Sequence, residues 1–572
     1  MPTKRIGITG KRAESTENQD YNIITCRILL PRAATPVRPL GTRECVLPAL
    51  RHMIRKVHDR RGFLGVLSAG ACIFVLAGGV KAQQLASPKK RPCVLMIVAD
   101  DMNWDTPGCF GGAAPDITPN LDRLAAEGVR FMHAYVNVSI CTPSRSVLLT
   151  GLYPANNGVE GFQRIRPGTE TLPAVLNKAG YLCGIIGKPL RQQELFRWSV
   201  TYRWPGVGDE DRWGRDPAVY RRFAKDFFAM AKRSNQPFFL MANSHDPHRP
   251  FGGGEATRPH QQIAPASRAF RAEEVRVPGF LPDLPGVRRD LAAYCTSARR
   301  LDDMAGAVLE ELAEAELAEN TIVVFLSDHG MDFPSAKFNC YVDSTRSPWI
   351  IRWPGQIEKG TVDRSHMVSA VDLLPTILEA VGLPATHSDG RSFLPLLRGQ
   401  PQSDRDCVFA QFHHIHGEDA LPMRSVLTRE SAYVFNPWSN GERRFTRLGG
   451  VAFGAMQQAA KTDTELAARI RHLQFRTVEE FYDLGADPNC LVNLLNDGRS
   501  GKTLADTRQK QVDDLRGKLR GWMVRVQDPA LGAFDNRHRP EVLEEYVKTY
   551  RTRAAKEVEA LRPYEKATDY RF

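Results

Sequence analysis

Cysteine is scarce in this chain, and its spacing excludes two classes of protein. The 572 residues include 11 cysteines, spread irregularly and without a single C-x-x-C pair. A disulfide scaffold needs dense cysteine in a short chain, and a structural zinc site needs paired cysteines, so neither is expected. Because the number is odd, at least one thiol stays outside any disulfide, and Cys141 is the natural candidate.

The sequence also lacks internal repeats and an apolar run long enough to cross a bilayer. Its most apolar stretch, Val66–Val80, has 15 residues, whereas a spanning helix needs about 20. A repeat array and a multi-span membrane protein are therefore excluded.

Beyond the N-terminal segment, the chain has little excess of positive charge. The net charge is +12, but residues 1–82 contain 14 Lys and Arg against 5 Asp and Glu, which leaves only +3 for the rest. A nucleic-acid-binding protein would carry its positive surplus on the folded part. We therefore expect no nucleic-acid partner.

The N-terminal segment is typical of an export signal preceded by an extension. Residues 1–52 show no sustained periodicity and are interpreted as a disordered extension or as a start codon placed too early. Residues 53–82 contain basic residues, the apolar stretch and the small-residue end Val80-Lys81-Ala82, which is the pattern of a cleavable signal. Arg60-Arg61 resembles the twin-arginine signal, so we expect a periplasmic or extracellular protein with no stable membrane span after cleavage. A retained N-terminal anchor is the alternative.

From residue 91 onward, apolar strands alternate with amphipathic helices. Continuous apolar runs predict strands buried on both faces, at Cys93–Ala99, Tyr181–Gly187, Pro237–Ser244, Thr321–Ser327 and Pro348–Trp353. Helical spacing predicts helices at Thr118–Gly128, Thr171–Ala179, Ala218–Ser234, Asp290–Asn320 and Val371–Val381. The alternation predicts an α/β fold with a mostly parallel central sheet flanked by helices, and it fades beyond about Leu397.

The stretch Cys141-Thr142-Pro143-Ser144-Arg145, followed by a small and apolar run, predicts a short helix with a cysteine at its start. Pro143 suits the first helical position, and Gly151 is a natural stop. Free N–H groups at such a helix start favour an anion, and Arg145 lies one turn in, where it can point to the same place. An ordinary capped helix with a buried cysteine is the other interpretation of these residues.

This pentapeptide and the later Thr150-Gly151 resemble the signature of the type I sulfatases, and further motifs of that family follow in the same order from Pro92 to about Asp497. The resemblance implies the alkaline-phosphatase-like sulfatase fold, with a catalytic domain at 91–396. The segment Phe481–Pro488 is similar to one in the smaller C-terminal α+β domain of sulfatases, here expected at 397–572. It also implies that a separate maturation enzyme oxidises Cys141 to formylglycine (3-oxoalanine), whose hydrate is the nucleophile.

Acidic residues at two strand ends predict a metal site. Asp100 and Asp101 follow one predicted strand, and Asp328 and His329 follow another, at the sheet edge where open α/β folds place their sites. Together with oxygens of a modified Cys141, these groups suit one hard divalent cation, and Ca²⁺ is the expected ion. The resemblance implies the same four positions, although some family members have asparagine in place of His329.

The resemblance also implies a set of catalytic residues. One hydroxyl of the hydrate attacks sulfur, and deprotonation of the other then expels sulfate. Groups that neutralise the sulfate and the developing charge usually make the largest catalytic contribution. The general acid and the substrate-binding residues are those of the family's His-Asp-Pro-His-Arg motif. The charge-neutralising residues are Arg145, Lys188 and Lys337, the general acid is His245, and His248 and Arg249 are expected to bind substrate.

One position departs from the family pattern. In Gly187-Lys188-Pro189-Leu190, Leu190 stands where a histidine that helps to handle the hydrate's proton is usual. Either Arg191 or Gln192 replaces that histidine by position, or turnover is impaired.

The loop Phe333-Pro334-Ser335 begins four residues before Lys337. It resembles the corresponding loop in the branch of the family that removes N-sulfate from glucosamine. Sulfated glycan is therefore the expected substrate class, with N-sulfoglucosamine as the first candidate. The alternatives are a phosphatase or phosphonate monoester hydrolase of the same fold, an inactive protein that binds sulfated glycans, and a membrane-tethered scaffold. The sequence leaves the oligomeric state open.

Overall fold

The computed structural model describes residues 90–188, 193–202, 214–252, 264–415, 420–495 and 506–567. The expected extension at 1–52, the expected signal at 53–82, and Leu190, Arg191 and Gln192 lie outside these residues. Among the helices described, none has the length and apolar character needed to cross a membrane.

An eight-stranded sheet with the order β5-β4-β6-β1-β7-β8-β2-β9 forms the core. Its strands are β1 (Cys93–Ala99), β2 (Val129–Phe131), β4 (Leu182–Gly187), β5 (Val200–Tyr202), β6 (Phe238–Asn243), β7 (Thr321–Ser327), β8 (Trp349–Arg352) and β9 (Thr361–Asp363). All residues of β1, β6 and β7 are buried, because helices cover both faces of the sheet. β1 pairs in parallel with both β6 and β7. The predicted mostly parallel sheet is confirmed, with β8 antiparallel to β7 and to β2.

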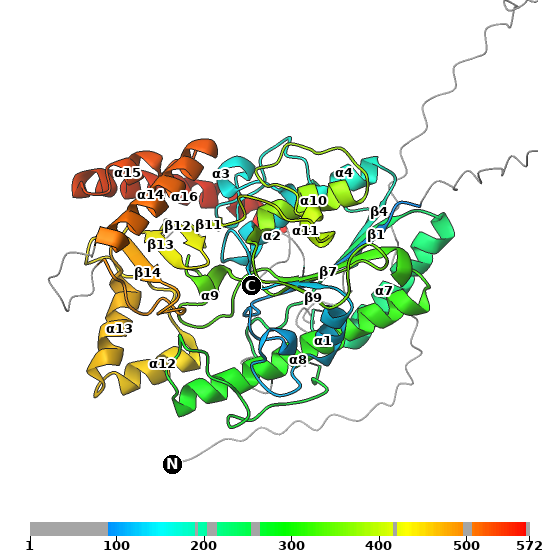
Figure 1. The fold of residues 1–572 in the computed structure, drawn as a ribbon, viewed down its shortest axis with the longest axis horizontal. Helices are drawn as coiled ribbons and strands as arrows, with labels where there is room; N and C mark the ends of the chain where they lie inside the picture. The colour runs from blue at the N-terminus through cyan, green and yellow to red at the C-terminus, as the bar shows by residue number, and fades with distance from the viewer. Residues whose placement is uncertain are drawn as a thin grey trace, which may run out of the picture. The chain divides into compact units, whose positions relative to one another are not determined.

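Two groups of helices lie on opposite sides of these strands (Figure 1). One group consists of α1 (Pro119–Ala126), α7 (Pro217–Ser234) and α8 (Pro285–Glu314); the other consists of α2 (Cys141–Thr150), α4 (Leu172–Lys178) and α10 (Leu373–Ala380). Shorter elements are η1 (Gly108–Phe110), α3 (Pro154–Asn157), α5 (Gln193–Phe196), η2 (Ala318–Asn320), α9 (Val342–Thr345), η3 (Ala370–Asp372) and α11 (Leu394–Leu397). Two short strands, β3 (Ala134–Tyr135) and β10 (Val368–Ser369), pair with each other.

The prediction of one helix from Asp290 to Asn320 is wrong at both ends, because α8 begins at Pro285 and ends at Glu314. Glu316 takes a left-handed conformation with φ of +58°. The N–H of Leu317 then donates to the carbonyl of Leu312 at 3.2 Å, which is how helices commonly end. No glycine marks this end in the sequence.

A second, antiparallel sheet follows in the C-terminal part, in the order β11-β12-β13-β14. Its strands are β11 (Cys407–Phe412), β12 (Met423–Thr428), β13 (Ser431–Phe435) and β14 (Glu479–Asp483). The helices of this part are α12 (Gly450–Ala459), α13 (Thr464–Phe475), α14 (Asp506–Arg525), α15 (Leu531–Asp535) and α16 (Pro540–Ala567). This separate sheet with its helices confirms the predicted smaller α+β part.

The carboxyl ends of four neighbouring parallel strands meet at one edge of the central sheet. Lys188 follows β4, His245 follows β6 after one residue, Asp100 and Asp101 follow β1, and Asp328 follows β7. Since these strands are adjacent and parallel, side chains far apart in the sequence come together there.

Candidate active site

Cys141 is the first residue of helix α2. Ile140 is extended and accepts a hydrogen bond from the N–H of Ser144 at 3.0 Å, so the helix begins two residues before Pro143. The expectation that Pro143 takes the first position is therefore wrong, because proline is tolerated throughout the first turn, where N–H groups lack helical partners. The predicted stop is confirmed: Gly151 has φ of +63°, and its N–H donates to the Val147 carbonyl at 2.8 Å.

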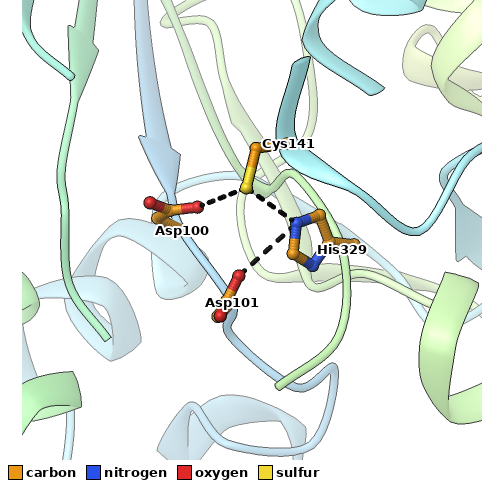
Figure 2. Close-up of side chains that lie close together, drawn as sticks. All are labelled: Asp100, Asp101, Cys141 and His329. Carbon is orange, nitrogen blue, oxygen red and sulfur yellow. Dashed lines mark hydrogen bonds and ion pairs between the residues drawn. The ribbon is translucent and has the colours of Figure 1, made fainter. Parts of the chain in front are cut away.

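Three other predicted metal-site residues, Asp100, Asp101 and His329, lie around Cys141 (Figure 2). The Sγ atom of Cys141 lies 3.4 Å from Asp100 Oδ1 and 3.4 Å from His329 Nε2. The same nitrogen of His329 lies 3.4 Å from Asp101 Oδ1. One potential ligand atom from each residue lies within 4.8 Å of the others, and all four residues are buried. The structure thus brings together residues from three separate parts of the chain.

Asp328 joins this cluster and holds Arg145 beside it. Its Oδ1 lies 3.6 Å from His329 Nε2 and accepts the N–H of Asp101 at 3.2 Å, while Oδ2 accepts Arg145 Nε at 2.9 Å. Arg145 is 1% exposed, and its Nη1 and Nη2 have no hydrogen-bond partner among the described residues. Nη2 also lies 3.8 Å from Asp100 Oδ1. Unpaired buried donors are costly, and these two nitrogens can donate to an anion at the cluster.

Two lysines contact the carboxylates of the cluster. Lys188 Nζ donates to Asp100 Oδ2, and Lys337 Nζ donates to Asp101 Oδ2 at 2.6 Å. Burial disfavours the charged amines, but Asp100 and Asp101 outweigh it and raise the pKa of Lys188 and Lys337 respectively. Burial likewise disfavours ionised Asp100, yet Lys188 and its cationic neighbours hold the pKa of that carboxyl well below its usual range. These groups are therefore charged at neutral pH.

The cluster fits a hard divalent cation. Asp101 Oδ1 is buried and accepts no hydrogen bond among the described residues. Burial lowers the pKa of His329, but Asp328, Asp101 and Cys141 reverse this effect and raise it to about 9, which reports a strongly negative local potential. Carboxylate oxygens are the donors that such an ion prefers, and His329 would join them only in its neutral form, after the ion displaces its proton.

The three predicted residues after β6 lie in different surroundings. His248 Nε2 lies 3.9 Å from Asp101 Oδ2, with 36% of its side chain exposed. His245 Nε2 is buried, and burial together with Lys188 and Arg215 holds the pKa of that imidazole well below its usual range. Arg249 donates to both oxygens of Asp290, at 3.0 and 2.7 Å, and its guanidinium lies 4.1 Å from the centre of the Phe251 ring.

Comparison with known proteins places this arrangement in a family. The family model "Sulfatase" matches residues 92–383, and the model "N-sulphoglucosamine sulphohydrolase, C-terminal" matches residues 334–434. The chain is 31% identical over 484 residues to N-sulphoglucosamine sulphohydrolase of Homo sapiens, covering 77% of this chain and 91% of the human protein. The chain belongs to the sulfatase family. Sulfatases are sulfuric ester hydrolases, so the predicted enzyme class is confirmed.

Two solved structures share the fold of this sulfatase. A 2-O glycosaminoglycan sulfatase matches with a TM-score of 0.55 and 20% identity, covering 77% of this chain and 93% of that chain. A protein in complex with its substrate D-glucosamine-2-N,6-O-disulfate matches with a TM-score of 0.55 and 19% identity, covering 77% of this chain and 99% of that chain. At these identities the likeness establishes the fold alone.

The sequence analysis missed the residues that fix the histidine loop of this sulfatase. Asp246 is 1% exposed and accepts hydrogen bonds from Arg300 Nε and Nη2, both at 2.7 Å, and from Arg215 Nη1. Its backbone carbonyl accepts the N–H of Asp100 at 3.0 Å. Arg300 lies inside the amphipathic helix α8, where nothing in the local sequence distinguishes it from a surface arginine.

A second group with potential ligand atoms, Glu160, His414 and Glu557, occurs elsewhere in the described part of the sulfatase. Protein donors already contact these atoms. The Gln163 amide nitrogen lies 2.8 Å from His414 Nε2 and 2.9 Å from Glu557 Oε2, and Tyr550 donates to Glu160 at 2.7 Å. This network joins helix α16 to the segment that follows α3.

Proposed function

We propose that this sulfatase removes sulfate from a sulfated glycan, with the N-sulfate of glucosamine as the first candidate group. The observation that carries the proposal is the buried cluster at the start of α2, where Cys141 lies between carboxylates and three cationic side chains. The glucosamine N-sulfate is supported by the C-terminal family match and by the likeness to the human N-sulphoglucosamine enzyme. The loop Phe333-Pro334-Ser335 points to the same branch.

In this proposal Cys141 is converted to formylglycine by a separate maturation enzyme, and the site holds one calcium ion. Asp100, Asp101, Asp328 and His329 would hold the ion together with the modified residue, and the ion would act as a Lewis acid toward the sulfate. The formylglycine would supply a nucleophilic hydroxyl at the start of α2. Leu190 lies outside the described residues, so the group that replaces the usual histidine stays open.

The side chains of this protein would bind and orient the sulfate. Arg145 has two nitrogens, Nη1 and Nη2, without hydrogen-bond partners among the described residues, and Lys188 and Lys337 place ammonium groups against Asp100 and Asp101. Donors held in a buried site before the reaction stabilise developing charge without reorganising. We propose that these three cations neutralise the sulfate oxygens.

The proton for the leaving group is expected to come from the loop after β6. His245, the acid that the family motif implies, and His248 are the candidates. Burial and neighbouring cations lower the pKa of both imidazoles, and the partial exposure of His248, with its Nε2 3.9 Å from Asp101 Oδ2, makes His248 the residue to test first. We expect His248→Ala to lower kcat on N-sulfoglucosamine by about 10²- to 10³-fold, the range of general acid catalysis. The same variant should change kcat on 4-nitrophenyl sulfate far less, because nitrophenolate leaves without a proton.

His245→Ala serves as the comparison in that experiment. If His245→Ala shows the selective loss on N-sulfoglucosamine and His248→Ala does not, then His245 is the acid.

The substrate class is tested by initial rates on four compounds. We expect kcat/KM on 4-nitrophenyl sulfate to exceed that on 4-nitrophenyl phosphate by at least about tenfold, and sulfate release from N-sulfoglucosamine to exceed that from glucosamine 6-sulfate. The second pair has the same sugar, but the cleaved bond changes from a sulfamate N–S bond to a sulfate ester O–S bond, so it reports which sulfate group the enzyme removes. A large preference for phosphate would overturn the sulfatase activity, and a preference for the 6-sulfate would overturn the N-sulfate alone.

We further propose that the mature protein is exported to the periplasm or the extracellular space, supported by the signal-like sequence at 53–82. N-terminal sequencing of secreted protein should begin after Ala82. A start before Met53 in the exported protein would contradict cleavage.

A further inference from the structure

The turn that carries Lys337 has an unusual backbone. Phe338, the next residue, has φ of +61°, in the left-handed region that bulky side chains rarely occupy. Such conformations persist only where the surrounding structure holds them. Since Lys337 Nζ donates to Asp101 at 2.6 Å, any relaxation of this turn would move the ammonium group.

Hydrogen bonds on both sides of Phe338 hold the turn. The N–H of Phe338 donates to the Ser139 carbonyl at 3.1 Å, and the N–H of Asn339 donates to Ser139 Oγ at 2.8 Å. The side-chain Nδ2 of Asn339 donates to the Lys337 carbonyl at 2.7 Å. Ser139 lies two residues before Cys141, so the same bonds join the lysine turn to the segment that precedes the nucleophile position.

One arginine from the C-terminal part secures Asn339 from the other side. Arg476 follows helix α13, is 5% exposed, and donates from Nη2 to Asn339 Oδ1 at 2.5 Å. Its Nη1 donates to the hydroxyl of Tyr341, and its guanidinium lies 4.6 Å from the centre of that ring. Tyr341 in turn donates to Glu480 Oε2 on β14 at 2.8 Å. The arginine therefore holds two points of the segment after Lys337.

We infer that Arg476 is a positioning residue for catalysis, which acts through Asn339 to hold Lys337 against Asp101. The inference rests on the proposed contact between Lys337 and the sulfate. The described contacts of Arg476 include Asn339, Tyr341 and Phe445 but no residue of the cluster, so its effect would pass through the backbone of the 337–339 turn. The C-terminal sheet thereby contributes to the geometry of a site built on the central sheet.

A double-mutant cycle on the matured enzyme tests this. Lys337→Ala should lower kcat on 4-nitrophenyl sulfate by about 10²-fold or more, as for loss of one charge-stabilising donor. Arg476→Gln should lower kcat by about tenfold when Lys337 is present, because small misplacements are costly. In the Lys337→Ala background the same substitution should change kcat less than about twofold, since residues that act together are not additive. Rates are normalised to formylglycine content by mass spectrometry.

Controls separate positioning from general destabilisation. Arg405 is 7% exposed and donates to Asp372 at 2.6 Å; Arg405→Gln should lower the melting temperature but leave kcat within about twofold. Asn339→Asp keeps the oxygen that accepts from Arg476 but loses the N–H that donates to the Lys337 carbonyl. If Arg476→Gln folds poorly, Asn339→Asp takes its place in the double-mutant cycle with Lys337→Ala and should show the same non-additive loss of kcat. Arg476→Lys should recover part of the loss, because an ammonium can make only one of the two contacts.

Two results overturn different statements. If Arg476→Gln lowers kcat equally in both backgrounds, the positioning role is wrong while the proposed function stands. If Lys337→Ala alone leaves kcat unchanged, the proposed role of Lys337 is wrong.

Discussion

Replacing Cys141 with alanine is expected to lower kcat on 4-nitrophenyl sulfate by about 10⁴-fold or more, as for loss of a catalytic nucleophile. The thiol position lies 3.4 Å from both Asp100 and His329, so a nucleophile at position 141 is held at the cluster. The variant and the native enzyme are produced with a formylglycine-generating maturation enzyme, and their steady-state rates are compared. In the matured enzyme alanine replaces formylglycine and removes the oxygens that would help to hold the ion, so the two melting temperatures are compared after chelation, where they should differ little.

A matched control replaces a cysteine far from the cluster. Cys295 is a buried free thiol in helix α8, and Cys295→Ala should retain activity. Peptide mass spectrometry across Ser139–Arg145 should show a loss of about 18 Da in the native protein, the difference between a thiol and an aldehyde. A fully active enzyme with an untouched thiol, or substantial turnover by Cys141→Ala, would contradict the formylglycine mechanism.

Chelating divalent cations is expected to lower kcat by about 10²- to 10³-fold, in line with the several kcal/mol that a Lewis-acid cation supplies. The same treatment should lower the melting temperature, because an ion that binds only the folded state stabilises it by about 2.7 kcal/mol at 100 times its dissociation constant. We expect a cation to bind here because several carboxylates lie together at the start of α2. Their negative charge also raises the pKa of His329 to about 9. Calcium should restore both activity and melting temperature.

Two aspartate variants locate the ion. Asp101→Asn should abolish the calcium-dependent rise in melting temperature. Asp302→Asn should keep it, because Asp302 is a buried carboxylate that instead accepts the N–H groups of Asn120 and Leu121, at 3.0 and 2.8 Å, at the start of α1. Full activity after exhaustive chelation, with no bound ion detected by elemental analysis, would count against a resident cation.

The central strands and the cluster at their ends could be predicted because their signals are local. A strand buried on both faces must be continuously apolar, and polar residues directly after it fall at the sheet edge. The direction of β8 could not be predicted, because an apolar run such as Trp349–Arg352 does not specify its pairing partner.

The supporting contacts of the site could not be predicted for a different reason. Arg300 and Asp246 are 54 positions apart, and Arg476 and Asn339 are 137 apart. A buried arginine on an amphipathic helix has the same sequence context as an exposed one, and only the tertiary structure shows which carboxylate or amide it contacts.

Arg215 and Arg300 hold Asp246 in place, and this affects any attempt to change the substrate specificity of the enzyme. His245 and His248 flank that aspartate on a single loop, so they share one anchor, part of which lies in helix α8. Substitutions selected on α8 for thermal tolerance would therefore alter proton transfer as a side effect. Libraries that vary either histidine should keep both arginines constant, so that a change in leaving-group preference reflects the imidazole and not a displaced loop.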